Sequence, residues 1–382
     1  MHSAIPYDEN IVLAHADAAF EAEDFETAFA DYALVIKHNP ESVFAYFRRG
    51  LIYSKMNLLD KAIADFTQAI SLYAEFSTAY FIRGMLYNEL GDNEKALSDF
   101  SQAIDFEPDN AQIYCERAQL YVELGQPETA IQDYSQALEL DPELEEVYLL
   151  RGATYADLEN YEAALDDLNF LLAHDPENDS AYMLRGICHQ ACENYPEALE
   201  DFAQVIALNP DRYQPHMKRA DIYEKCDLYD EAIAEYNRAF ELDKEEAVHD
   251  EIYLCRGRLY SKINALDLAL KDYTTLIETY PEREIAYLER GLVLSDLEHF
   301  QEAHADFSHV ILNNPESEFA YLFRGIVYAR LQYFEEAVED YSHAIALRPN
   351  IYAAYENRAL AYEILGNQAA ADQDRATMQL YK

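Results

Sequence analysis

One arginine recurs along this chain at a fixed interval of 34 residues, with a single 37-residue step in the middle. The series is Arg49, Arg83, Arg117, Arg151, Arg185 and Arg219, then Arg256, Arg290, Arg324 and Arg358. Sixteen residues after each arginine stands an acid: Asp65, Asp99, Asp133, Asp167, Asp201, Glu235, Asp272, Asp306, Asp340 and Asp374. His15 and Asp31 have the same offset upstream, which makes eleven units. A repeat this regular predicts a stacked array, in which each unit contacts only its neighbours.

Each unit has the pattern of two amphipathic helices. In the third unit, Tyr80 and Tyr87 fall on one face of a first helix, and the turn sequence GDN at 91–93 ends it. Ala96 and Phe100 then fall on one face of a second helix. A single pair of this kind cannot bury both apolar faces, but stacked pairs can. The sequence therefore predicts an all-α fold built from helix-turn-helix units.

The spacing of small and aromatic residues within the unit resembles a known family. Its Tyr…Gly…Tyr…Ala…Phe/Tyr…Ala…Pro pattern, with a 34-residue period, is similar to the tetratricopeptide repeat family over about residues 7–382. The resemblance implies a right-handed α-solenoid superhelix that forms one domain over residues 1–382. We expect units 1–7 at about 7–244, an irregular connection at 245–249 where three residues are inserted, and units 8–11 at 250–382.

The repeated charges depart from that family's commonest pattern, which has leucine at the arginine slot and often an aromatic residue at the acid slot. Because both slots have changed together, we expect each arginine to reach across to the acid of its own unit. The alternative is that the arginines line a ligand site. The expected structural pairs include Arg83–Asp99, Arg117–Asp133, Arg151–Asp167 and Arg185–Asp201.

Net charge restricts the class of partner. The chain has 73 acids and 28 bases, a formal charge of −45, so nucleic acid and anionic membrane surfaces are disfavoured and a basic protein is favoured. Residues 101–200 contain 23 acids and only three bases, which are Arg117, Arg151 and Arg185. The alternative reading is that the acidity only keeps a long solenoid soluble. Five irregularly spaced cysteines, with no secretory signal and no membrane-span run, favour a cytoplasmic protein.

The family resemblance also implies where a partner would bind, because first helices line the concave surface of such arrays. Large apolar residues occupy the slots on that surface near both ends of the chain, and polar residues such as Gln112 and Glu146 lie between. An alternative is that adjacent units cover these side chains. The candidate groove residues are Phe44, Phe47, Leu51, Phe81, Met85, Leu149, Met183, Leu288, Leu292, Phe319, Leu322 and Ile326.

Catalytic signatures are missing from the sequence. We find no phosphate loop, no HExxH motif and no nucleophile elbow, and we expect no catalytic residue, no cofactor and no metal site. Cys188 and Cys192 flank His189 at a spacing that could hold a metal, but core and turn packing explains them better. His299, His304 and His309 are five residues apart, a spacing that rotates around a helix.

Two functions fit these observations. The first is a non-catalytic scaffold or adaptor that binds a partner segment, basic with apolar anchors, in its concave groove. The alternative is an acidic inhibitor or immunity-type protein that neutralises a basic protein such as a toxin. An accessory subunit of an enzyme stays open as a third, and the sequence leaves the oligomeric state unknown.

Overall fold

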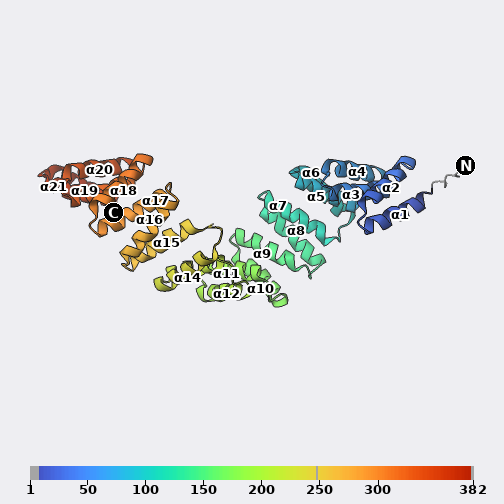
Figure 1. Ribbon diagram of the computed structural model, residues 1–382, viewed down its shortest axis with the longest axis horizontal. Helices are drawn as coiled ribbons and strands as arrows, with labels where there is room; N and C mark the ends of the chain where they lie inside the picture. The colour runs from blue at the N-terminus through green and yellow to red at the C-terminus, as the bar shows by residue number, and fades with distance from the viewer. Residues whose placement is uncertain (1–7, 247, 380–382) are drawn as a thin grey trace. The chain divides into compact units, whose positions relative to one another are not determined.

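The computed structural model describes residues 8–246 and 248–379, and these form helices joined by short turns (Figure 1). The first eleven helices are α1 (Glu9–Glu21), α2 (Phe25–His38), α3 (Val43–Lys55), α4 (Leu59–Leu72), α5 (Ser77–Glu89), α6 (Asn93–Phe106), α7 (Ala111–Glu123), α8 (Pro127–Leu140), α9 (Glu145–Asp157), α10 (Tyr161–His174) and α11 (Asp179–Ala191). The others are α12 (Tyr195–Leu208), α13 (Gln214–Lys225), α14 (Tyr229–Leu242), α15 (His249–Lys262), α16 (Leu266–Thr279), α17 (Glu284–Asp296), α18 (Phe300–Asn313), α19 (Glu318–Arg330), α20 (Phe334–Leu347), α21 (Tyr352–Ile364) and α22 (Gln368–Met378).

Odd-numbered helices are the first helices of the eleven units and even-numbered helices are the second helices. Helix pairs such as α5 and α6 pack together, and second helices also pack on the next first helix, as α4 does on α5 and α16 on α17. Neighbouring first helices contact one another directly, for example α5 with α7 and α17 with α19. The prediction of an all-α fold made of paired helix-turn-helix repeats is confirmed.

The chain divides into two compact parts, residues 1–201 and residues 202–382, with the boundary inside α12. Each part is described by itself below. The expectation of a single domain with an irregular connection at 245–249 stays a prediction, and residue 247 of that connection lies outside the described residues. In the described part of the chain, none of the helices combines the length and the apolar character needed to cross a membrane.

A residue with left-handed backbone conformation lies in the turn between the two helices of every unit. The backbone φ at this slot lies between 56° and 78° in all eleven units, and glycine occupies it at Gly91, Gly125 and Gly366. In the third unit the Asp92 amide donates to the Tyr87 carbonyl, five residues back, which satisfies one of the last carbonyls of α5. The turn sequence therefore ends the first helix and reverses the chain in very few residues.

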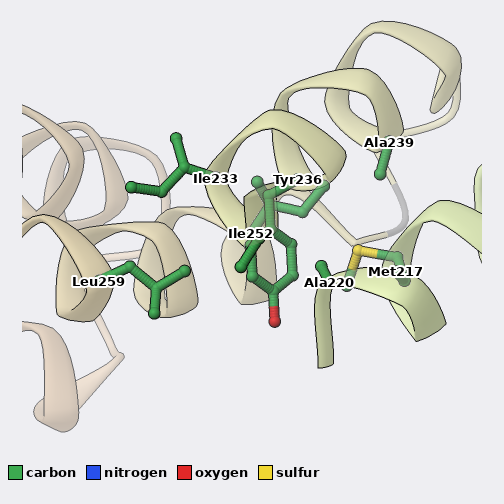
Figure 2. Close-up of a cluster of buried hydrophobic side chains, with 8 residues drawn as sticks. Met217, Ala220, Ile233, Tyr236, Ala239, Ile252 and Leu259 are labelled. Carbon is green, nitrogen blue, oxygen red and sulfur yellow. The ribbon is translucent and has the colours of Figure 1, made fainter. Parts of the chain in front are cut away.

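Small residues allow the helices of each core to approach closely. Ala220 of α13 and Ala239 of α14 are fully buried in one such core, together with Tyr236 of α14. Figure 2 shows that Ile252 and Leu259 of α15, the first helix of the next unit, lie in the same cluster. The core is therefore shared between one unit and the next, which explains why a single helix pair could not bury its own apolar faces.

Candidate functional site

The repeated arginines bind the repeated acids in the geometry expected of a guanidinium and a carboxylate. In nine units both Nε and Nη2 of the arginine donate to the two oxygens of one aspartate, at 2.6–3.0 Å. The four pairs Arg83–Asp99, Arg117–Asp133, Arg151–Asp167 and Arg185–Asp201 are among them. In the first unit, His15 Nδ1 lies 2.5 Å from Asp31 Oδ2.

These pairs are largely removed from water. The Asp167 carboxylate is 7% exposed and the Arg151 side chain 18% exposed. The guanidinium also lies over the Tyr148 ring, with its central carbon 5.9 Å from the ring centroid, and over Tyr155 at 6.0 Å. Hydrogen bonds from the guanidinium to Asp167 raise the pKa of Arg151 above its ordinary value.

A third contact, which sequence reasoning missed, joins eight of the units to the unit before. Nη1 of Arg151 donates to Ser135 Oγ of the preceding second helix, at 3.0 Å. Seven further arginines make the same kind of bond to Thr67, Ser101, Asn169, Asn237, Thr274, Ser308 and Ser342. The signal was present, because a hydroxyl or amide residue stands two positions after most of the repeated acids. We call this series of contacts the arginine ladder.

The ladder is interrupted in the seventh unit. Ala203 stands where a hydroxyl or amide residue would accept from Arg219, and the acid of this unit is a glutamate. Glu235 accepts from Arg219 Nη2 at 2.9 Å and also contacts His216 Nδ1 at 2.6 Å. The buried Nε atom of Arg219 has no hydrogen-bond partner. The longer side chain of glutamate therefore bridges two first-helix residues where the other units bind one.

Removing the inter-unit bond is expected to weaken the stack. Ser135→Ala should lower the free energy of unfolding by about 1.5–3 kcal/mol, because the bond is to a charged group with few alternative partners. Equilibrium urea unfolding followed by circular dichroism measures the change. Ser180→Ala is the matched control, since Ser180 is an exposed serine outside the ladder. Equal stability of the two variants would contradict a role of the ladder in coupling units.

The candidate groove residues all lie on first helices, and in each compact part of the chain we call the surface of the first helices that carries them the first-helix face. Three of them are exposed: Phe44 at 39%, Met85 at 40% and Phe319 at 41%. Seven are half-buried, and these are Phe47, Leu51, Phe81, Leu149, Leu288, Leu292 and Ile326. The structure brings several of them into shared contacts, because Phe47 and Leu51 pack on one core cluster and Leu288 and Leu292 on another.

Two of the candidates are buried in the structure. Leu322 is only 4% exposed and packs with Tyr341 and Ala344 of α20, and Met183 is 9% exposed. Both side chains are buried, so neither is exposed enough to act as an anchor for a partner.

Two exposed residues on the last first helix were not predicted. Leu360 is 50% exposed and Ile364 is 62% exposed, both on α21. Leu360 stands two residues after Arg358, the same slot as Leu51 and Ile326. The position of Leu360 in this slot was therefore a signal available in the sequence.

His304, His309 and Cys188 contact neighbouring side chains in the structure. His309 stacks on Tyr287 at 4.1 Å between ring centroids, and His304 Nε2 lies 2.9 Å from the Tyr328 hydroxyl. Burial raises the pKa of the Cys188 thiol to about 11, which disfavours the reactive thiolate. Among the residues that the structure describes, no group of three or more His, Cys, Asp or Glu side chains could hold a metal ion.

Comparisons with known proteins agree with this architecture. Family models described as tetratricopeptide repeat match residues 43–76, 149–191, 191–247 and 318–351. A model described as TPR repeat matches residues 84–125 and 118–158, so the matches together span more than half of the chain. A search of curated protein sequences gave no significant match.

Solved structures with the same kind of fold are similar at low sequence identity. YrrB, described as a TPR protein with an unusual peptide-binding site, is 24% identical with a TM-score of 0.45, covering 48% of this chain and 95% of its own. A tetratricopeptide repeat protein from Parabacteroides merdae is 20% identical with a TM-score of 0.46, covering 65% and 98%. MamA from Desulfovibrio magneticus is 19% identical with a TM-score of 0.43, covering 45% and 97%. The repeat spacing, the stacked helix pairs and the family matches agree, and the chain belongs to the tetratricopeptide repeat family.

Proposed function

We propose that this protein is a non-catalytic scaffold of the cytoplasm that binds a segment of a partner protein on its first-helix face. The observation that carries the proposal is the exposure of Phe44, Met85 and Phe319 on that face, each about two-fifths open to solvent. Exposed large apolar side chains are typical of protein interfaces, and each compact part of the chain has at least one of these three residues. Membership of a family made up mostly of partner-binding scaffolds supports the same function.

The chemistry of the partner follows from charge. A chain with a formal charge of −45 attracts a basic partner at long range and repels an acidic one. Apolar anchors of the partner would contact Phe44, Met85 and the half-buried residues around them. We therefore propose a partner segment that combines apolar anchors with basic residues.

A second function, an acidic inhibitor that neutralises a basic protein, is favoured by one observation. The three bases of residues 101–200 all bind aspartates, so none of them offsets the acids around them. The dependence of partner affinity on salt concentration distinguishes the scaffold from the inhibitor. Affinity that rests on acidic surfaces should fall steeply as salt rises above about 0.1 M, whereas affinity that rests on apolar anchors should change little.

The experiment compares two triple variants in affinity capture from the source cell, with quantitative mass spectrometry of the bound proteins. Phe44→Ala, Met85→Ala and Phe319→Ala together are expected to reduce the main captured partner at least about tenfold, as loss of central apolar anchors does. Leu34→Ala, Leu268→Ala and Leu312→Ala form the matched control. These three leucines are also exposed, but they lie on second helices.

Equal capture by the two triple variants would refute binding at the first-helix face. Both variants should first be compared by circular dichroism, so that a loss of capture is read only from folded protein. Titration of the captured partner against purified protein at low and high salt then decides between the scaffold and the inhibitor.

A further inference from the structure

An apolar cavity lies beside the turns inside the first two units. Its volume is about 470 Å³, within the range of about 300–1,000 Å³ that is typical of ligand pockets. The rings of Phe25, Phe29 and Tyr53 line it together with Met56 and Leu58. The last two belong to the turn between α3 and α4, and both are exposed to solvent. We call this cavity the turn pocket.

Two lysines lie against the aromatic rings of the turn pocket. Lys61, which lines the pocket, has its Nζ 5.5 Å from the ring centroid of Tyr53, and Lys55 Nζ lies 5.7 Å from that of Phe25. In the part of the chain that the structure describes, neither ammonium makes a hydrogen bond or an ion pair. Glu26 also lines the pocket, but it does not pair with either lysine. Both cations are therefore open to a carboxylate from outside the chain.

The third unit shows where a carboxylate binds such a lysine. Lys95 has the same slot as Lys61, and its Nζ lies 5.1 Å from the ring centroid of Tyr87. Oδ2 of Asp92 lies 2.5 Å from Lys95 Nζ, and Oδ1 accepts from the Lys95 amide at 3.4 Å. Leu58 stands at the slot of Asp92 in the second unit. The turn pocket therefore has the lysine and the ring of this arrangement without its carboxylate.

The start of α4 has no side-chain acceptor for the same reason. Leu58 is the N-cap residue of α4 and makes no capping hydrogen bond, whereas the N-cap residue of α6, Asp92, does. The first turn of a helix presents backbone amides and the positive end of the helix dipole, so a carboxylate is favoured there. An ammonium group, an uncapped helix start and an apolar cavity therefore adjoin one another at Leu58 and Lys61.

We propose that the turn pocket binds a segment of a partner protein in which a large apolar side chain stands next to an aspartate or glutamate. The apolar side chain fills the cavity between the aromatic rings. The neighbouring carboxylate binds Lys61 and the start of α4, in the position that Asp92 has in the third unit. Residues 1–7 contain no aspartate or glutamate and do not fit this description. The pocket lies beside the turns and not on the first-helix face, so this inference goes beyond the proposed function.

The charge of the whole chain sets the conditions of the test. A formal charge of −45 repels an acidic segment at long range, so only direct contacts can hold it. At about 0.15 M salt the screening length is about 8 Å, which weakens the distant repulsion more than a direct ion pair. Affinity should therefore be measured at this salt concentration.

The test uses the full chain and a rhodamine-labelled peptide, Gly-Asp-Phe-Leu-Asp-Gly, with binding followed by fluorescence anisotropy. Leu58→Asp supplies the missing carboxylate from within the chain, so it should weaken peptide binding at least about tenfold. The same substitution should leave the protein at least as stable as wild type in thermal unfolding, because aspartate is a good N-cap residue.

Leu228→Asp is the matched control. Leu228 is likewise an exposed N-cap residue without a capping hydrogen bond, at the same slot of the seventh unit, but Glu231 stands there in place of the lysine. This variant should change peptide affinity less than about twofold, because it adds the same charge far along the chain from the pocket. Equal weakening by Leu58→Asp and Leu228→Asp would overturn the proposal.

A second pair of variants tests the cations. Lys55→Gln with Lys61→Gln should weaken binding of the same peptide at least about tenfold. Lys37→Gln with Lys95→Gln removes the same charge from two exposed lysines outside the pocket and should weaken it less than about twofold. The peptide Gly-Asn-Phe-Leu-Asn-Gly, which has no carboxylate side chain, should bind at least about tenfold more weakly. If it bound as well as the acidic peptide, no carboxylate would be recognised and the proposal would fail.

Sedimentation of the unlabelled protein tests the other occupant. A dimer that Leu58→Asp dissociates would show that a second copy of this chain fills the pocket, which would overturn binding of a partner protein. A monomer at the same concentrations supports the proposal. The variant with Phe44, Met85 and Phe319 replaced by alanine should bind the acidic peptide as wild type does. Failure of the scaffold proposal would therefore appear in the capture experiment and leave this one intact.

Discussion

Replacing Arg151 with alanine is expected to lower the free energy of unfolding by about 3–5 kcal/mol, one of the largest losses a single substitution in this chain should cause. The reason is the Asp167 side chain, which is 7% exposed and would be left without its partner in a site that is nearly closed to water. The loss also removes the bond to Ser135 in the preceding unit. Urea unfolding measures the total, and hydrogen exchange of α9 and α10 shows whether the damage is local.

The control replaces both charges together. Arg151→Leu with Asp167→Tyr restores the commonest residues of the family at these slots and leaves no unpaired charge. Replacing a buried pair by apolar residues is often neutral, so this variant should be far more stable than Arg151→Ala. If both variants unfolded at the same urea concentration as wild type, the pair would have no structural importance.

Gly291→Val should be nearly as damaging, with an expected loss of about 3 kcal/mol, the upper end of the usual cost of overpacking. A Cβ atom at Gly291 would lie 2.6 Å from Cε1 of Phe307, which is fully buried and has no room to move. Alanine should cost less, because Ala118 already stands at this slot in the fourth unit. Thermal unfolding of wild type, Gly291→Val and Gly291→Ala gives the order of their stabilities.

Gly152→Ala is the matched control at the same slot. There the second helix presents Leu168, and a Cβ would lie 3.4 Å from its Cγ, a tight but tolerable contact. The gain in helix propensity, up to about 1 kcal/mol, should make this variant as stable as wild type or slightly more stable. If substitution at Gly152 lowered the free energy of unfolding as much as substitution at Gly291 does, contact with the aromatic ring would not be the cause of the loss.

Sequence reasoning performed well where a pattern repeats and less well where one side chain decides. The period of 34 residues and the two helical faces led to the paired helices, because a repeated unit can bury its faces only against neighbours. Leu322 and Met183 show the limit. Their slot is the same as that of Phe47 and Leu288, yet burial depends on the side chains of the second helix below.

The sequence by itself determined the family, the helix pairs and which arginine belongs with which acid, since these follow from spacing along the chain. Only the tertiary structure decided how exposed each groove residue is and which side chain of the preceding unit accepts the third hydrogen bond of each guanidinium. The physical reason is that periodicity fixes the direction of a side chain on its own helix, whereas exposure and hydrogen bonding depend on neighbouring helices whose approach is set by packing.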